Sequence, residues 1–145
     1  MVGASEGYGS ELSSTLERLL RLIREVSTVG DISATSAAVL SRLGRTGPQR
    51  VTELAMAEGI SQPAMSQLIN RIEDDGLVVR TTDAADRRGV LVEISERGAA
   101  VISARREERA RVLEAALGRL EPADRSAIAA ALPALGRLVD TVLEP

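Results

Sequence analysis

The chain has 145 residues, 44% hydrophobic and 27% charged, with a formal net charge of −3. This length suits one folded domain, or one domain with oligomerisation helices, and the composition fits neither a disordered protein nor a membrane protein. Cysteine and histidine are absent, which removes disulfides, thiolate chemistry, the commonest metal ligand and the commonest general base. We therefore expect no enzyme activity, no metal site and no cofactor.

The N-terminal region predicts a loose end followed by a helix. Residues 1–10 are rich in glycine and polar side chains, so we expect a flexible N-terminus there. They lack a basic segment followed by an apolar run, which predicts a cytoplasmic protein without a secretion signal. From Glu11 to Val29, apolar residues recur at helical spacing. This pattern predicts an amphipathic helix that Gly30 and Asp31 end.

Two further helices are expected before residue 60. Ser33 can cap the first, and Gly44 and the Gly47-Pro48 pair are placed to end it. Thr52 can cap the second, a short helix that stops at Gly59. Because the next segment begins directly after this glycine turn, the order is that of a helix-turn-helix.

The segment after Gly59 has the clearest helix signals in the chain. Ser61 can cap it, and Ile60 can pack on Met65 as a hydrophobic staple. Apolar residues then recur at i, i+3, i+4 and i+7, namely Met65, Leu68, Ile69 and Ile72. These residues predict a helix with one buried stripe.

The other face of this helix is the candidate DNA-reading surface. Short polar side chains and an arginine there are of the types that reach base edges or phosphates from a major groove. The candidate residues are Ser61, Gln62, Ala64, Ser66, Gln67, Asn70 and Arg71. An ordinary solvated helix face is the alternative. The acids Glu73, Asp74 and Asp75 come only at the end of the helix, which favours DNA because phosphates repel carboxylates.

A β-hairpin is expected next. Leu77 to Thr81 reads as a strand, Asp83 to Arg88 as a charged turn, and Val90 to Ile94 as the return strand, with Ser95 capping a further helix. Arg87 and Arg88 at the tip of this wing can enter a minor groove, where negative potential is concentrated. A surface salt bridge between one of these arginines and Asp86 is the alternative, and both interactions can coexist.

The run ISQPAMSQLINRIEDDGLVVRTTDAADRRGVLVEISERG resembles the core of the MarR family of transcriptional regulators. The D-x-x-D-R-R wing and Gly98 after a capping hydroxyl carry the resemblance, which extends in helix order from about Glu11 to Val142. It implies a homodimer whose recognition helices enter successive major grooves while the wings reach flanking minor grooves. It also implies that Arg88 is the minor-groove arginine, that Asp86 is its neighbouring acid, and that residues 62–71 read bases and phosphates.

The C-terminal third predicts a dimer interface. Residues 96–120 form a long helical stretch whose charged middle, including Arg105 and Arg106, is expected to face water. After Pro122, apolar residues follow steps of four and three that suit a helix seam, and Pro133 predicts a kink or break near residues 129–133. The candidate dimerisation residues are Leu12, Leu16, Leu19, Leu117, Leu132, Leu135, Val139 and Val142. Packing within one chain is the alternative.

These elements predict a mainly α fold with a small β-hairpin wing. We expect a winged helix-turn-helix DNA-binding domain over residues 31–95 and a helical dimerisation region over residues 11–30 and 96–145. The expected function is a homodimeric repressor of a pseudo-palindromic operator, with double-stranded DNA as partner. The resemblance implies a small-molecule effector of unknown identity, although Tyr8 is the only aromatic residue. A winged-helix dimer that binds a protein is the alternative, supported by the net charge.

Overall fold

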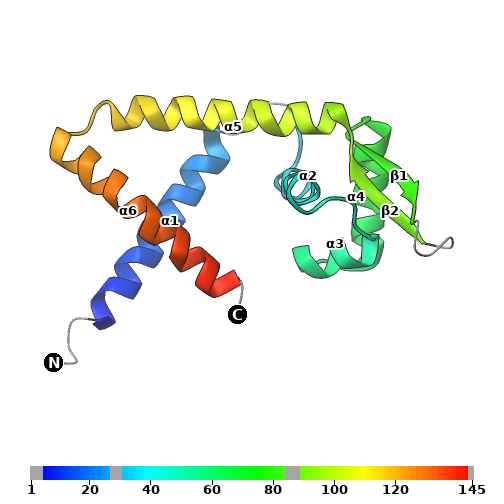
Figure 1. Ribbon diagram of the computed structural model, residues 1–145, viewed down its shortest axis with the longest axis horizontal. Coiled ribbons are helices and arrows are strands. Elements are labelled where there is room, and N and C mark those ends of the chain that lie inside the picture. Colours follow the sequence, from blue (N-terminus) through cyan, green and yellow to red (C-terminus); the bar gives the residue numbers. More distant parts are fainter. Residues whose placement is uncertain (1–4, 27–30, 84–88, 144–145) are drawn as a thin grey trace. The chain divides into compact units, whose positions relative to one another are not determined.

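The computed structural model describes residues 5–26, 31–83 and 89–143 (Figure 1). Over these residues the chain forms six helices and one antiparallel hairpin. The predicted mainly α fold with a small β-hairpin wing is therefore confirmed. The chain divides into two compact units, residues 1–109 and residues 110–145. Among the described helices, none combines the length and the apolar composition that crossing a bilayer requires.

The first helix, α1, spans Ser5–Val26. It begins before Glu11, so the predicted flexible segment over residues 1–10 is wrong from Ser5 onward. Gly7 and Gly9 each cost about 1 kcal/mol in a helix relative to alanine. That cost is tolerated here because extending a helix that has already nucleated needs no new nucleus.

Helix α2 spans Ala34–Thr46 and has the predicted cap, since Ser33 Oγ accepts the Ser36 N–H at 3.0 Å. It ends at Gly47, which has a φ of 81°. Gly44 lies inside the helix, contrary to expectation. Only the glycine at which the backbone enters a positive φ ends this helix.

Helix α3 spans Val51–Glu58, and its N-cap is Arg50 rather than the predicted Thr52. The Glu53 carboxylate accepts the Arg50 N–H at 2.8 Å and so satisfies one backbone donor at the helix start. Gly59 adopts the left-handed conformation at a φ of 65° and makes the predicted turn.

Helix α4 spans Gln62–Asp74 and begins as predicted, because Ser61 Oγ accepts the Ala64 N–H at 3.3 Å. Three residues of the predicted stripe are fully buried, and Leu68 packs against them partly buried. The largest fully buried side chains of the molecule are Val39, Leu40, Leu43, Leu54, Met65, Ile69, Ile72, Val78 and Val92. Helices α2, α3 and α4 and the hairpin thus share one core.

The hairpin pairs β1, Val78–Thr82, with β2, Val90–Ile94. Its register places Val78 opposite Ile94 and Thr82 opposite Val90. The loop between α2 and α3 adds an isolated bridge beside β2, in which Gln49 and Val92 exchange backbone hydrogen bonds of 3.0 and 2.8 Å. This bridge, which the sequence analysis missed, fixes the hairpin to the loop that precedes α3.

Helix α5, Glu96–Leu117, begins in close contact with the turn between α4 and β1. Ser95 Oγ accepts the Gly98 N–H at 3.0 Å and donates to the Gly76 carbonyl at 2.6 Å. Gly98 is buried, and a Cβ at this position would overlap the Leu77 carbonyl oxygen and lie 2.9 Å from Ile94 Cγ1. Only glycine fits here without movement of the neighbouring backbone.

Helix α6 spans Pro122–Leu143 without interruption. Of the kink or break predicted near residues 129–133, the break is therefore wrong, and the kink stays a prediction. Pro133 removes one backbone donor and leaves the Ala129 carbonyl without its helical partner. Residues 118–141 are all exposed, and water can therefore bond that carbonyl. A helix of this length accommodates one missing hydrogen bond.

We predict that Gly98→Ala lowers the free energy of unfolding by about 1–3 kcal/mol, because the added methyl group has no space against the Leu77 peptide. Urea unfolding at matched protein concentration measures this change. The control is Gly44→Ala, whose Cβ would lie 3.9 Å from Ile94 Cδ1, and which should stabilise the helix by about 0.5–1 kcal/mol. Equal effects of the two substitutions would contradict the close approach.

Candidate nucleic-acid interface

The outward face of α4 presents almost all of the predicted reading residues. Ser66 is partly buried, and the other predicted residues are exposed, namely Ser61, Gln62, Ala64, Gln67, Asn70 and Arg71. Met65, Ile69 and Ile72 on the opposite face hold the helix against the core. The buried side chains therefore fix the orientation of α4, and its polar face points away from the core.

Arg80 contacts this helix from β1, and the sequence analysis did not single it out. Its register partner is Val92, so it lies on the same face of the hairpin as the buried Val78. Its Nη2 donates to Asn70 Oδ1 at 2.7 Å, and its Nη1 pairs with the Glu73 carboxylate. Strand alternation counted from Val78 was the signal that would have found it.

The Arg80 contacts change the electrostatics of the reading face. Glu73 is the acid nearest to the polar face in sequence, and it is partly buried and paired with a guanidinium. Asp74 and Asp75 are exposed beyond it, at the C-terminal end of the helix. The first turns of α4 therefore carry no carboxylate, and the first acid that follows is neutralised.

A second ion pair holds the base of the wing. Arg50 Nη2 lies 2.9 Å from Asp83 Oδ2, and the two side chains are 42% and 18% exposed. The Asp83 N–H donates to the Gly89 carbonyl at 3.0 Å. Together these bonds tie the base of the wing to the start of α3. The predicted wing residues Asp86, Arg87 and Arg88 lie outside the described residues.

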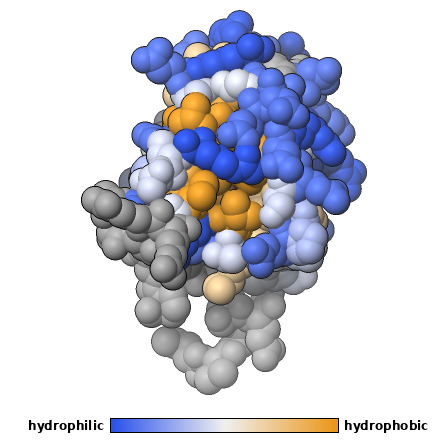
Figure 2. Space-filling model, turned by 90° about the vertical axis from the view of Figure 1, so that its right-hand side faces the viewer, coloured by the Kyte–Doolittle hydropathy of each residue, from blue (hydrophilic) through white to orange (hydrophobic). Residues whose placement is uncertain are grey.

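Figure 2 shows the face of the first unit that carries the hairpin. Hydrophilic side chains cover most of this face, and apolar side chains surface in a central patch. Val79 and Val90 of the two strands are about half exposed. A mostly hydrophilic surface is suited to a wet, polar interface of the kind that proteins form with DNA.

The candidate dimerisation residues lie in both compact units of the chain. In α1, Leu16 and Leu19 are exposed and Leu12 is partly buried. In residues 110–145, Leu117 is partly buried, whereas Leu132 at 60%, Leu135 and Val139 are exposed. The side chain of Val142 lies outside those described. Helices α1 and α6 thus each expose more large apolar side chains than a soluble monomer ordinarily carries in one stretch.

An open cavity of about 340 Å³ lies among α1, α2 and α5 within the first unit. It is lined by Ile23, Arg24, Ile32, Ala34, Ala37, Ala38, Ser41, Arg105 and Arg109. Arg105 is only 6% exposed, so the expectation that it faces water is wrong. Its burial, together with the nearby Arg109 guanidinium, lowers the pKa of Arg105. The Arg105 Nε atom is buried as well, so the burial extends from the aliphatic stem into the guanidinium group.

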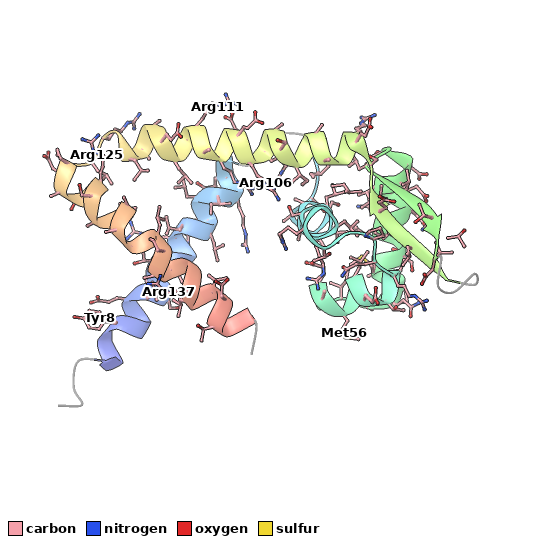
Figure 3. The ribbon with its side chains drawn as sticks, viewed as in Figure 1. Tyr8, Met56, Arg106, Arg111, Arg125 and Arg137 are labelled. Atoms are coloured by element: carbon pink, nitrogen blue, oxygen red, sulfur yellow. The ribbon has the colours of Figure 1, made fainter. Side chains whose placement is uncertain are left out.

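Among the described residues, the lining of this cavity combines three guanidinium groups with mostly apolar side chains and contains no carboxylate. No aromatic ring lines it either, and Tyr8 is 71% exposed on α1 (Figure 3). The cavity is therefore suited to a small anion with an apolar part, held by charge and hydrogen bonds rather than by stacking.

The chain is similar to known transcription regulators in sequence and in fold. The sequence profile of the MarR family matches residues 32–90. An HTH-type transcriptional regulator of Mycobacterium tuberculosis is 30% identical over 140 residues, which cover 97% of this chain and 98% of that protein. The crystal structure of the transcriptional regulator Tm0710 from Thermotoga maritima is 28% identical, with a TM-score of 0.72 over 91% of this chain and 99% of that one.

A third similar protein is BpsR of Bordetella bronchiseptica, whose DNA binding is regulated by 6-hydroxynicotinic acid. It is 25% identical, with a TM-score of 0.59 over 94% of this chain and 97% of its own. The full-length match at 30% identity and the matching family profile lead to one assignment. The chain belongs to the MarR family of winged helix-turn-helix transcription regulators, which are DNA-binding proteins and not enzymes.

Proposed function

We propose that this protein acts as a homodimer that binds a pseudo-palindromic operator and represses transcription by occluding the promoter. The observation that carries the proposal is the polar face of α4, exposed and free of carboxylates over its first turns. Gln67 and Arg71 on this face are side chains that can contact bases and phosphates in a major groove. The pairing of Glu73 with Arg80 removes the nearest source of repulsion.

The proposed domain roles follow the sequence. Residues 31–95 form the DNA-binding part, and residues 11–30 with 96–145 form the dimerisation region. The exposed apolar side chains of α1 and α6 support this role, because covering them needs a second surface. A two-fold dimer would bind half-sites about one helical turn apart. Arg88 would enter the minor groove beside each half-site, with Asp86 orienting the neighbouring guanidinium.

We further propose an effector that carries a carboxylate. The cavity lined by Arg24, Arg105 and Arg109 supports an anion, and regulation of BpsR by an aromatic acid is consistent with such a ligand. The cavity lies among α1, α2 and α5. A bound anion would therefore contact helices of both the DNA-binding part and the dimerisation region. Release of DNA would follow if the ligand favoured a spacing of the two recognition helices that does not match the operator.

The second candidate function is binding to a protein partner through the winged domain. The net charge of −3 and the exposed Asp74 and Asp75 favour it. The pairing of Glu73 with Arg80 weakens it, since this acid is not available to a basic partner.

The DNA-binding proposal predicts that the protein binds a selected operator much more tightly than unrelated DNA, with affinity that falls steeply as salt rises. Gln67→Ala and Arg88→Ala should each weaken operator binding about tenfold or more without changing thermal stability. Fluorescence anisotropy measures the affinity of each protein for each DNA, and a melting curve checks its thermal stability. Arg125→Ala, which removes the same charge from α6, is the matched control (Figure 3). Equal weak binding to both DNAs would favour the protein-binding alternative.

The dimer proposal predicts that Leu132→Glu converts the dimer to a monomer, because a charge placed in an apolar interface is not compensated. Sedimentation velocity across a range of concentrations measures the association. Ala130→Glu adds the same charge to α6 away from the apolar seam and should leave the dimer intact. Dissociation by both variants, or by neither, would contradict the assigned interface.

The effector proposal predicts that 6-hydroxynicotinic acid, or a related aromatic acid, raises the melting temperature and weakens operator binding, whereas its uncharged amide does neither. Arg109→Ala should abolish the thermal shift. Arg106→Ala, on the same helix but outside the cavity lining, is the control (Figure 3). An amide that acts as strongly as the acid would show that charge recognition plays no part.

A further inference from the structure

We infer that Arg80 determines which bases Asn70 reads, so that each α4 favours a keto base, guanine or thymine, over an amino base, adenine or cytosine, at one position of each half-site. The inference rests on the proposed operator binding. It assigns Arg80 a positioning role and Asn70 a specificity-determining role.

The orientation of the Asn70 amide follows from the chemistry of its partner. Arg80 Nη2 lies 2.7 Å from the Asn70 side chain. A guanidinium has donors only, so the atom that faces it must be the carbonyl Oδ1. Turning the amide over would place its NH2 group against the guanidinium, which would replace a charge-assisted hydrogen bond by a clash of donors. The Asn70 oxygen is therefore held toward Arg80.

Arg80 is itself fixed from two sides. Its backbone belongs to β1, where it pairs with Val92, and its Nη1 bonds to the Glu73 carboxylate. Glu73 lies three residues after Asn70, so both acceptors lie on the same side of α4. The guanidinium bridges them through separate nitrogens. This arrangement holds the amide more firmly than a single exposed hydrogen bond would.

The groups that remain to face DNA are the two N–H donors of Asn70, whose side chain is exposed. In the major groove, guanine O6 and thymine O4 are acceptors, whereas adenine N6 and cytosine N4 are donors. The familiar bidentate pairing of asparagine with adenine needs the amide oxygen to accept from N6. Here that oxygen already accepts from a cation, and the positive charge beside it repels an amino group and attracts a keto oxygen.

Binding to operators with each base at every half-site position tests the inference. For the wild type, one position per half-site should favour guanine or thymine at least about fivefold. Asn70→Ala should remove that preference, whereas Asn70→Asp, which keeps the bond to Arg80 but replaces the donor by an acceptor, should shift it to cytosine or adenine. Gln67→Ala, one turn away on α4, is the control. It should weaken binding overall but leave the base preference at this position unchanged.

A double variant, Arg80→Met with Glu73→Gln, releases the amide without leaving an unpaired acid near DNA. It should accept adenine at the same position, with thermal stability recorded in parallel. A wild-type preference for adenine or cytosine at the Asn70 position would overturn the inference. So would an Asn70→Ala variant that weakens all sequences equally, since that result indicates a phosphate contact. Wild-type binding without any base preference would overturn the proposed function together with the inference. The other two results would overturn the inference alone.

Discussion

The first turn of α5 lies directly against the peptide group of Leu77, and this contact requires glycine at position 98. Ser95 closes the same joint, because its hydroxyl bonds both to the Gly76 carbonyl and to the N–H of Gly98. The end of α4, the start of β1 and the start of α5 meet there. The joint therefore sets where the hairpin leaves the core, and the hairpin register then places Arg80 beside α4. The position of Arg80 against the polar face of α4 depends on this chain of contacts.

Most of the fold could be predicted because its signals are local. Ser33 and Ser61 cap helices within three residues of their partners, and the stripe from Met65 to Ile72 shows its period within one helix. The start of α1 differs from the prediction because a helix, once nucleated, propagates through Gly7 and Gly9. The break at Pro133 was wrong because an exposed helix can replace one lost bond with water.

The parts of the site that could not be predicted depend on contacts distant in sequence. Arg80 reaches Asn70 only after the hairpin has folded back on α4, and Arg105 is buried only when α5 packs near α1 and α2. The bridge between Gln49 and Val92 likewise joins segments far apart in the chain. Local sequence patterns do not predict contacts between residues this far apart in the chain. The net charge was equally uninformative, because what matters for DNA is that the acid nearest the reading face is paired.

In the proposed function, α4 enters the major groove twice in each operator. Methylation interference tests it most directly, because dimethyl sulfate modifies guanine N7 in the major groove and adenine N3 in the minor groove. We predict that methylated guanines prevent binding in two clusters about one helical turn apart, related by the two-fold symmetry of the operator. Interference confined to adenines, or a single asymmetric cluster, would contradict it.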